Sequence, residues 1–320
     1  MRNEETDLMA GQPVPMVLGC GPMRQENARA ARASLNAFYE EGGRVFDTAS
    51  VYGSSERVIG DWIAAHGLGS QVRVVTKGGH PDDSWRSRLT TAEILSDAEA
   101  SVTALGIRSL DCFMLHRDDH DVTIQEIASC LSRLIGEGLC LKIGVSNWTA
   151  PRVAALNAAL KEFGTHQLSS VSNYFGLAVP SRPPTWPGVR SVDTDLMEAA
   201  ERLEFRMLGW SALSGGYFSG HEISDHEFAS EINARRRLLL AEVARSAEAE
   251  VSAVLARWLA TADPQITPIM RSLNPAHVTQ LCRAVCDSSL DPSVNSLISA
   301  IAGTQMSRSR RLLLSPAASW

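Results

Sequence analysis

Short apolar segments recur along this chain, and an amphipathic stretch with the period of a helix follows most of them. Eight of these segments are predicted to form β-strands: Met16–Gly19, Val45–Asp47, Val72–Thr76, Leu110–Leu115, Lys142–Ser146, Gln167–Val171, Arg206–Trp210 and Thr267–Met270. The stretches predicted to be helical are Gln25–Glu41, Ser55–His66, Thr91–Leu105, Thr123–Glu137, Pro151–Phe163, Ile232–Ala247 and Val251–Thr261. Strands that alternate with helices pair in parallel, and eight of them close into a barrel with the helices outside. The sequence therefore predicts an α/β fold, a (β/α)8 TIM barrel with extra helices and long loops at the C-terminal ends of the strands.

A doubly wound open sheet is the competing arrangement of the same elements. Such a sheet usually carries a G-x-G-x-x-G turn after its first strand, and the turn at residues 19–22 reads Gly-Cys-Gly-Pro. The barrel is therefore preferred. We expect residues 1–320 to form one domain, with a barrel core at about residues 16–285 and an irregular segment at 286–320.

Composition excludes several other classes of protein. The net charge of −6 and the absence of a basic run argue against a nucleic-acid groove. No run of 18 apolar residues predicts a membrane span, and the polar, acid-containing stretch Met1–Pro15 is not a secretory signal. The six cysteines are scattered without a C-x-x-C motif, which indicates reduced thiols in a cytoplasmic protein. The oligomeric state is not indicated.

Two connections are too long to be simple turns between a strand and a helix. Residues 176–193 follow the sixth strand and contain Pro180, Pro183, Pro184 and Pro187, whereas residues 211–231 follow the seventh strand and begin Gly-rich. Long ordered loops on a rigid scaffold often bind ligands. We therefore expect residues 176–193 to form an ordered lid or substrate loop rather than a helix.

Ionisable side chains stand at the ends of three successive predicted strands. Asp47 ends the second strand and Tyr52 lies in the loop after it; Lys77 follows the third strand and His116 the fourth. The chain contains only three lysines, so a lysine at a strand end is a rare choice. Because the chemistry of an α/β barrel collects at the C-terminal ends of its strands, these four side chains are expected to meet.

Together these four residue types can deliver a proton. A free phenol ionises near pH ~10 and is a poor acid at neutral pH. A neighbouring ammonium group favours the phenolate, and a carboxylate keeps that ammonium charged and oriented. A neutral imidazole can hold a substrate oxygen by a hydrogen bond. Such a set can protonate a carbonyl oxygen that receives a hydride. The alternative is structural: an acid that caps a turn and a tyrosine that covers the core.

Four segments resemble the signature segments of the aldo-keto reductase superfamily, particularly its bacterial oxidoreductases. They are Asp47–Tyr52, Lys77, the Leu-His-Arg-Asp sequence at 115–118 and the Gly-Val-Ser-Asn sequence at 144–147. The resemblance implies reversible reduction of a small-molecule carbonyl substrate, with NADPH or NADH bound without a Rossmann domain. It also implies that Tyr52 is the general acid, tuned by Lys77 and Asp47, and that His116 orients the carbonyl.

The same resemblance implies a set of cofactor contacts. Ser146 and Asn147, with Gln167 as a third contact, would hold the nicotinamide carboxamide, and Trp210 would stack on its ring. The loop after Trp210, with Ser211, Leu213 and Gly215, would let backbone N–H groups approach the pyrophosphate. Arg271 and Ser272 would meet the adenosine end, where a guanidinium favours NADPH through its 2′-phosphate. The sequence departs from the family pattern at His277, where a more basic residue is common, and lacks an acid after Gln167.

Two other functions fit parts of the sequence. The stretch His116–Asp121, with a second histidine at position 120, could be the metal site of a barrel hydrolase. Two histidines at this spacing chelate a metal when they lie on a helix, however, and this stretch is predicted to be a strand end and loop, so no metal is expected. A non-catalytic NADPH-binding sensor built on a reductase barrel is the other alternative.

Overall fold

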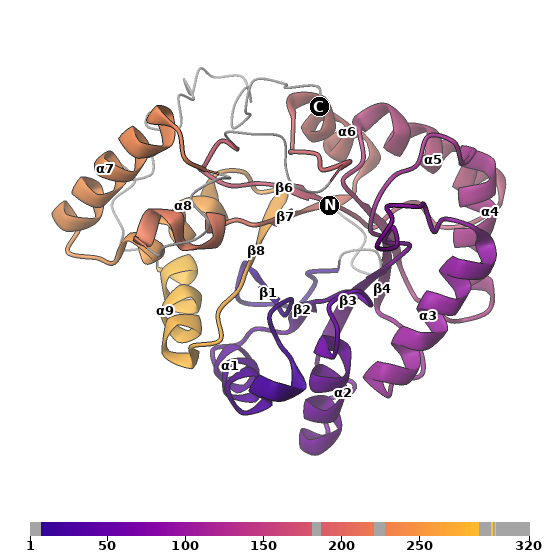
Figure 1. Cartoon of the computed structure of the whole chain (residues 1–320), viewed down its shortest axis with the longest axis horizontal. Helices are drawn as coiled ribbons and strands as arrows, with labels where there is room; N and C mark the ends of the chain where they lie inside the picture. The colour runs from indigo at the N-terminus through magenta and orange to yellow at the C-terminus, as the bar shows by residue number, and fades with distance from the viewer. Residues whose placement is uncertain (1–7, 181–186, 221–227, 288–295, 297, 299–320) are drawn as a thin grey trace.

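The computed structural model describes residues 8–180, 187–220, 228–287, 296 and 298. Its strands are β1 (Val17–Gly19), β2 (Val45–Asp47), β3 (Arg73–Gly78), β4 (Cys112–Leu115), β5 (Ile143–Ser146), β6 (Ser170–Tyr174), β7 (Arg206–Trp210) and β8 (Ile266–Met270). Each strand pairs in parallel with the next, and β1 pairs with β8, which closes the barrel (Figure 1). The predicted (β/α)8 TIM barrel is confirmed.

Helices surround the barrel (Figure 1). The α-helices are α1 (Ala28–Glu40), α2 (Ser55–His66), α3 (Thr91–Leu105), α4 (Ile124–Gly136), α5 (Ala150–Glu162), α6 (Thr194–Leu203), α7 (Glu231–Ser246), α8 (Val251–Thr261) and α9 (Pro275–Cys286). Two 3-10 helices are η1 (Gln25–Asn27) and η2 (Ser214–Ser219). All the predicted helices are present. α6 and α9 were not among them, although Asp193 caps α6 by accepting a hydrogen bond from the backbone N–H of Leu196.

Capping residues fix where several helices begin. Thr90 and Glu93 form a reciprocal capping box at the start of α3, and Thr123 and Glu126 form another at α4. Each box satisfies backbone N–H groups that the first turn of a helix leaves without partners. Gly106 ends α3 in the left-handed conformation with φ 65°. These capping residues begin α3 and α4 directly after the loops that follow β3 and β4.

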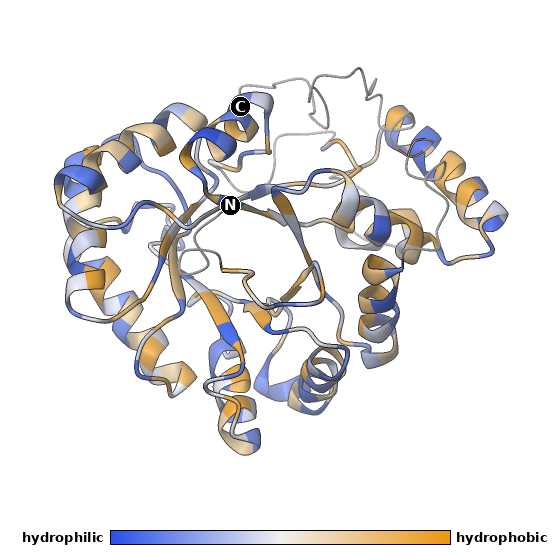
Figure 2. Cartoon of the chain, turned by 180° about the vertical axis from the view of Figure 1, so that it is seen from behind, coloured by the Kyte–Doolittle hydropathy of each residue, from blue (hydrophilic) through white to orange (hydrophobic). Residues whose placement is uncertain are grey.

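The core consists of two layers. Inside the barrel, side chains from alternating strand positions pack together with Leu8 from the segment before β1; they include Val45, Val75, Met114 and Leu208. A larger layer lies between the sheet and the helices and contains side chains such as Trp62, Phe46 and Phe113. Figure 2 shows the strands as mostly hydrophobic, whereas the helices carry both hydrophobic and hydrophilic residues. Burial on both faces explains why the strands are near-continuous apolar runs.

Helices α2 and α3 approach closely at one glycine. A Cβ atom on Gly60 of α2 would lie 2.5 Å from the backbone oxygen of Leu105 in α3. Real Cβ atoms do not make contacts this short, and a backbone oxygen cannot rotate away as the end of a side chain can. Gly60 therefore sets the distance between two helices that flank β3 and its Lys77.

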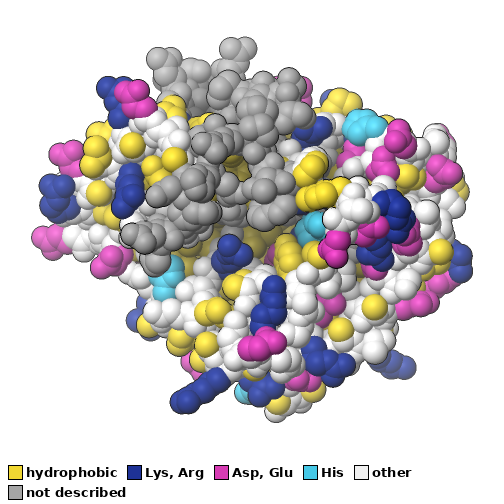
Figure 3. Space-filling view, in the orientation of Figure 1, with side chains coloured by type: hydrophobic (Ala, Val, Ile, Leu, Met, Phe, Trp, Pro, Cys, Tyr) yellow, Lys and Arg dark blue, Asp and Glu magenta, His cyan; other side chains and the backbone are white. Residues whose placement is uncertain are grey.

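The loop after β6 returns to the strand end before α6 begins. The backbone N–H of Tyr174 donates to the oxygen of Arg190, and the N–H of Val192 donates to Tyr174 in return. Part of the predicted 176–193 loop, residues 181–186, lies outside the described residues, as does most of the predicted irregular segment 286–320. Within the part of the chain that is described, no helix has the length and apolar character needed to cross a membrane. Charged side chains of both signs are interspersed over the face seen in Figure 3.

Candidate active site

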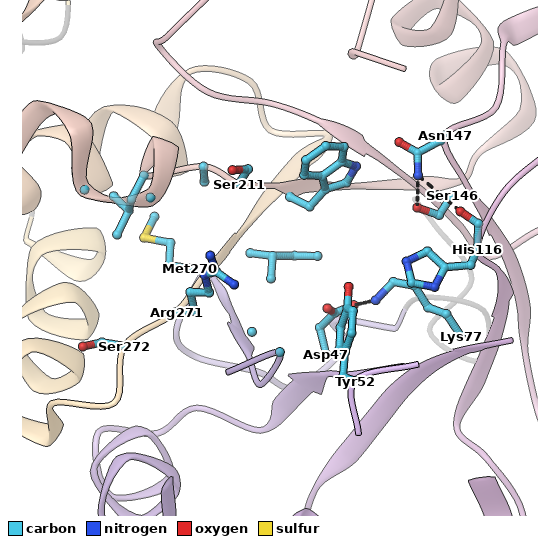
Figure 4. Close-up of a pocket in the computed structure, with 18 of the residues that line it drawn as sticks. Asp47, Tyr52, Lys77, His116, Ser146, Asn147, Ser211, Met270, Arg271 and Ser272 are labelled. Atoms are coloured by element: carbon cyan, nitrogen blue, oxygen red, sulfur yellow. Dashed lines mark hydrogen bonds and ion pairs between the residues drawn. The ribbon is translucent and has the colours of Figure 1, made fainter. Parts of the chain in front are cut away.

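A pocket opens at the C-terminal ends of the strands, with a volume of about 630 Å³. Every strand except β6 contributes a lining residue from its end or from the loop that follows it, among the described residues. The volume is within the range of cofactor and ligand sites. All four predicted catalytic residues line it, as do all the predicted cofactor contacts but one. Figure 4 shows His116 and Asn147 on one side of the pocket and Ser272 on the other.

A buried ion pair lies at the base of the pocket. Lys77 Nζ is 2.5 Å from Asp47 Oδ1 and donates a second hydrogen bond, of 2.9 Å, to the backbone oxygen of Thr48. Burial acts to lower the pKa of Lys77, but the attraction of Asp47 and of the Tyr52 oxygen outweighs it, so the pKa lies above its ordinary value. Burial raises the pKa of Asp47, and the Lys77 charge lowers it in part. The arrangement keeps a charged, oriented ammonium group below the ring of Tyr52.

Tyr52 lies between the ammonium group and an imidazole ring. Its ring centroid is 5.6 Å from Lys77 Nζ and 5.7 Å from the ring centroid of His116, which meets it edge-on at 81°. The loop that carries Tyr52 turns at Gly53, with φ 61°. Figure 4 shows the Tyr52 ring directed into the pocket beside Asp47 and Lys77. The three-strand arrangement expected from the sequence is therefore present in the structure.

His116 is neutral near pH 7. Burial, reinforced by the positive charges of Lys77 and Arg117, lowers its pKa well below the ordinary value. Its Nδ1 atom is buried and meets no hydrogen-bond partner in the described part of the chain. A proton on Nδ1 would have no acceptor there, so the favoured tautomer carries its proton on Nε2. His116 can thus donate a hydrogen bond to an oxygen in the pocket without carrying charge.

Ser146 and Asn147 form a polar edge at the end of β5. Asn147 adopts the left-handed conformation, with φ 65°, and its Nδ2 atom donates to Ser146 Oγ at 3.0 Å and to the backbone oxygen of His116 at 3.3 Å. Ser146 Oγ donates to the backbone oxygen of Ser172 at 2.8 Å. Both side chains are buried, held by hydrogen bonds and line the pocket. They present amide and hydroxyl groups suited to a carboxamide.

Trp210 ends β7 and lines the pocket. Its ring meets that of Tyr174 edge-on, with centroids 5.4 Å apart, and its Nε1 atom is buried without a partner in the described residues. The next residues turn sharply: Ser211, Gly215 and Gly216 all have positive φ values, of 57°, 61° and 93°. Successive turns of this kind direct backbone N–H groups into concave anion-binding sites. Ser211, Leu213 and Gly215, which were predicted to contact the cofactor, line the pocket.

Arg271 and Ser272 lie after β8 and complete the far side of the pocket. Arg271 is exposed, and its Nη1 atom would be 3.8 Å from a Cβ atom on Gly21, beside the Tyr52 ring. Ser272 Oγ accepts a hydrogen bond of 3.1 Å from the backbone N–H of Asn274, where α9 begins. His277 also lines the pocket. The guanidinium and the neighbouring hydroxyl form a site where a phosphate group could bind.

Gln167 does not reach the pocket. β6 begins at Ser170, three residues later than the sequence predicted, so Gln167 lies before the strand and is exposed at the opposite end of the barrel from the pocket. The Leu168 N–H bonds to the Asn157 side chain, and the first backbone bond to β5 comes from the Ser169 N–H, which donates to the oxygen of Ile143. The late start also places Asn173 near the C-terminal end of the strand, where its side chain bonds to the backbone of Trp148.

Several pocket residues were not predicted. The most prominent are His80, Arg117, Ser219, Ser252 and Leu255. His80 packs edge-on against His116, with ring centroids 4.8 Å apart, and its Nδ1 atom lies 2.8 Å from the backbone oxygen of Pro81. His80 and Arg117 stand directly after strands in the sequence, which was the available signal. Ser252 and Leu255 carried no such signal, because they belong to a helix, α8.

The second histidine of the 116–121 stretch does not join the pocket. His120 is exposed and lies 3.4 Å from Asp118, whose carboxylate also receives Arg152. In residues 8–287, apart from the two undescribed stretches, no three potential metal ligands gather into a group. The structure thus offers no observation that favours the metal-hydrolase alternative.

The pocket fits an extended nicotinamide dinucleotide. Ser146 and Asn147 offer hydrogen-bonding groups at one side, the turn after Trp210 offers backbone N–H groups, and Arg271 offers a positive charge at the other. Gly19 and Ile269 pack closely in the wall of the pocket, since a Cβ atom on Gly19 would lie 3.0 Å from the Ile269 side chain. This set of donors matches the carboxamide, pyrophosphate and phosphate groups of such a cofactor.

Known proteins are similar to this chain in sequence over much of its length. Aflatoxin B1 aldehyde reductase member 2 of Homo sapiens is 28% identical over 212 residues, covering 65% of this chain and 55% of that protein. Norsolorinic acid reductase of Aspergillus flavus is 23% identical over 266 residues, covering 78% of this chain and 66% of that protein. The chain thus spans a little over half the length of the aldehyde reductase that it matches. The model of the aldo/keto reductase family matches residues 15–302, and the chain belongs to that family.

Proposed function

We propose that this protein reduces an aldehyde or a ketone to an alcohol, with Tyr52 as the proton donor. The observation that carries this proposal is the position of the Tyr52 ring, 5.6 Å from Lys77 Nζ and 5.7 Å from the His116 ring at one pocket. An acid placed between a fixed positive charge and a neutral hydrogen-bond donor suits a carbonyl oxygen that becomes an alkoxide.

A nicotinamide cofactor would supply the hydride when bound, and the chain's own residues would hold and orient the substrate. His116 donates a hydrogen bond to the carbonyl oxygen and brings it to Tyr52. As negative charge develops on that oxygen, Tyr52 gives up its proton, and the charge of Lys77 stabilises the phenolate that remains. Asp47 holds Lys77 in place and keeps it protonated. Asp47, Lys77 and His116 are buried, which strengthens each of these interactions.

NADPH is the proposed cofactor, and NADH is the alternative. Ser146 and Asn147 would hold the carboxamide, Trp210 would stack on the nicotinamide ring, and the turn at residues 211–216 would contact the pyrophosphate. Arg271 supports the choice of NADPH because its exposed guanidinium has the geometry to bind a 2′-phosphate through two hydrogen bonds. The relatives' names include an aldehyde reductase, which agrees with a carbonyl substrate.

The decisive test removes one oxygen atom. Tyr52→Phe keeps the ring but removes the proton donor, so we expect kcat to fall by about 10²–10⁴-fold with aldehydes, while NADPH binding changes little. The measurement is NADPH oxidation with a panel of aliphatic and aromatic carbonyl compounds, beside quenching of tryptophan fluorescence by the cofactor. Unchanged turnover in this variant would exclude Tyr52 as the acid.

Tyr39→Phe is the matched control. Tyr39 lies on α1, and its hydroxyl donates to Gln71 at 2.7 Å, far in the fold from the pocket lining. The same chemical change there should leave kcat unaltered. The panel also separates the enzyme from a cofactor-binding sensor, because a protein that binds NADPH yet oxidises none of it with any carbonyl would be the sensor.

A further inference from the structure

Arg117, the residue after His116, places a buried guanidinium group at the pocket. The side chain is only 8% exposed and lines the pocket with His80 and His116. Its Nη1 atom donates to the backbone oxygen of His116 at 2.9 Å, which is the one hydrogen bond that the guanidinium makes within the described part of the chain. The Nε atom is buried and meets no acceptor there. The Nε–H is therefore unsatisfied, and no acceptor among the described residues binds Nη2.

The nearby carboxylates are committed to other cations. Asp118, the next residue, receives Arg152 in a bidentate pair with contacts of 2.6 and 3.0 Å. Asp47 is paired with Lys77. Among the described residues, Arg117 forms no salt bridge. Gly188 lies against its aliphatic part, since a Cβ atom added to Gly188 would be 3.8 Å from Arg117 Cδ. The described residues around the Arg117 guanidinium thus provide no carboxylate that could neutralise its charge.

An uncompensated guanidinium is costly to bury. Arginine keeps its charge, and an isolated buried ion costs several kcal/mol even after relaxation. Burial lowers the pKa of Arg117, with an opposing effect from Tyr52. The two imidazoles beside it supply no compensation, since burial lowers the pKa of both His80 and His116 and leaves them neutral near pH 7. A charge kept in this state is preorganised to receive an anion.

The position of Arg117 connects the anion to the substrate rather than to the cofactor. Arg117 follows β4, next to His116, which is the residue proposed to orient the carbonyl. The backbone turn proposed to hold the pyrophosphate follows β7, and Arg271 follows β8; both strands lie across the barrel from β4. An anion bound at Arg117 would therefore belong to the molecule whose carbonyl lies between His116 and Tyr52.

We propose that Arg117 binds a carboxylate of the substrate, so that the preferred substrates are aldehydes or ketones that also carry a carboxylate group. The free Nε–Nη2 edge matches the planar carboxylate through two parallel hydrogen bonds. Arg117 would be a specificity-determining residue, since it takes no part in transferring hydride or proton. This inference rests on the proposed carbonyl reductase function for its substrate, but not for its anion site.

Turnover of a matched substrate pair tests the specificity. Para-carboxybenzaldehyde and para-carbamoylbenzaldehyde have nearly the same shape and differ in charge. We expect wild-type kcat/KM to favour the carboxylate by about 10–100-fold, chiefly through KM, and Arg117→Gln to remove that preference, so that the two substrates have similar kcat/KM in the variant. Arg117→Lys should recover part of it. Arg133→Gln is the control, because it removes an exposed guanidinium that pairs with Glu137 on α4, outside the pocket lining, and it should keep the preference.

Binding without turnover separates this inference from the proposed function. Benzoate and benzamide are titrated by calorimetry into the full chain with saturating NADPH. Tighter binding of benzoate that Arg117→Gln abolishes supports the anion site, even if no carbonyl is reduced, in which case only the reductase function fails. Equal binding of benzoate and benzamide, or benzoate binding unchanged in Arg117→Gln, overturns the anion site and leaves the reductase function intact.

Discussion

At the scale of single residues, the ion pair of Lys77 and Asp47 sets the electrostatics of the pocket. Both side chains are more than nine-tenths buried, and their atoms meet at 2.5 Å. Two charges in such a place lose most of their hydration, and their mutual attraction offsets that loss only while both are present. The pair therefore serves the electrostatics of the pocket and adds little net stability to the fold.

A double-mutant cycle measures this dependence. Lys77→Met leaves a bare carboxylate and Asp47→Asn leaves a bare ammonium, so we expect each change to lower the free energy of unfolding by about 3–5 kcal/mol. The double variant leaves no charge and should lose clearly less than the sum of the two. Urea unfolding followed by circular dichroism gives the three values. Additive losses would show that the two charges are independent.

The pocket residues that could be predicted from the sequence are those whose position at the end of a strand places them in the pocket. Asp47, Lys77 and His116 stand at strand ends, and the strands could be recognised from their apolar composition. Arg117 and Asp118 show where this reasoning stops. They are neighbours in a loop, yet Arg117 lines the pocket and Asp118 turns to Arg152. That choice depends on loop backbone angles and on partners distant in sequence, which strand patterns do not contain.

At the scale of elements, the contact of α2 with α3 depends on Gly60. Alanine is the better helix former by about 1 kcal/mol. Its Cβ atom would nevertheless lie 2.5 Å from the Leu105 oxygen, and relieving such an overlap requires the helices to separate, at a cost of about 1–3 kcal/mol. We expect the clash to dominate, so that Gly60→Ala lowers the free energy of unfolding measured in urea.

Gly136→Ala is the matched comparison. Gly136 ends α4, is exposed and has no atom within 4 Å of an added Cβ. The same substitution there should leave stability unchanged or raise it by less than ~1 kcal/mol. If both alanine variants gain stability, the close approach of α2 and α3 is not a constraint on the fold.

Elements differ in how well the sequence revealed them. α8 and β7 were predicted with their observed bounds, because a clear apolar period coincides with abrupt ends. β6 was placed three residues early, because the apolar and β-branched pattern around Leu168 and Val171 does not show that the Leu168 N–H bonds to the distant Asn157 side chain. α6 went unpredicted because the proline-rich stretch before it gave no reason to resume a helix at Thr194.

At the scale of the whole molecule, the pocket joins both halves of the barrel. Lining residues come from β1 and β2 at the start of the chain and from β7, β8 and α9 near its end. A ligand that contacts all of these elements binds the folded state alone. Its binding therefore adds to the stability of the entire barrel, by about 2.7 kcal/mol when its concentration is 100 times Kd.

We expect NADPH to raise the melting temperature more than NADH does at equal concentration. A guanidinium bound to a phosphate contributes about 1.5–3 kcal/mol, so Arg271→Ala should weaken NADPH binding by about 10–100-fold and NADH binding by less than ~3-fold. Thermal unfolding of both proteins with each cofactor measures the difference. Equal losses for the two cofactors would mean that Arg271 does not distinguish them.

Closure of the barrel has a consequence for how this protein is made in the cell. Val17 of β1 pairs with Ile269 of β8, a partner synthesised about 250 residues later. At about 5–20 residues per second, a ribosome needs on the order of 10–50 s to supply it. Until then the edge of β1 is unpaired and the apolar interior of a half-built barrel faces solvent. The nascent chain thus passes through a long period in which chaperones that cover apolar surface would protect it, and it acquires the Arg271 side of its pocket last.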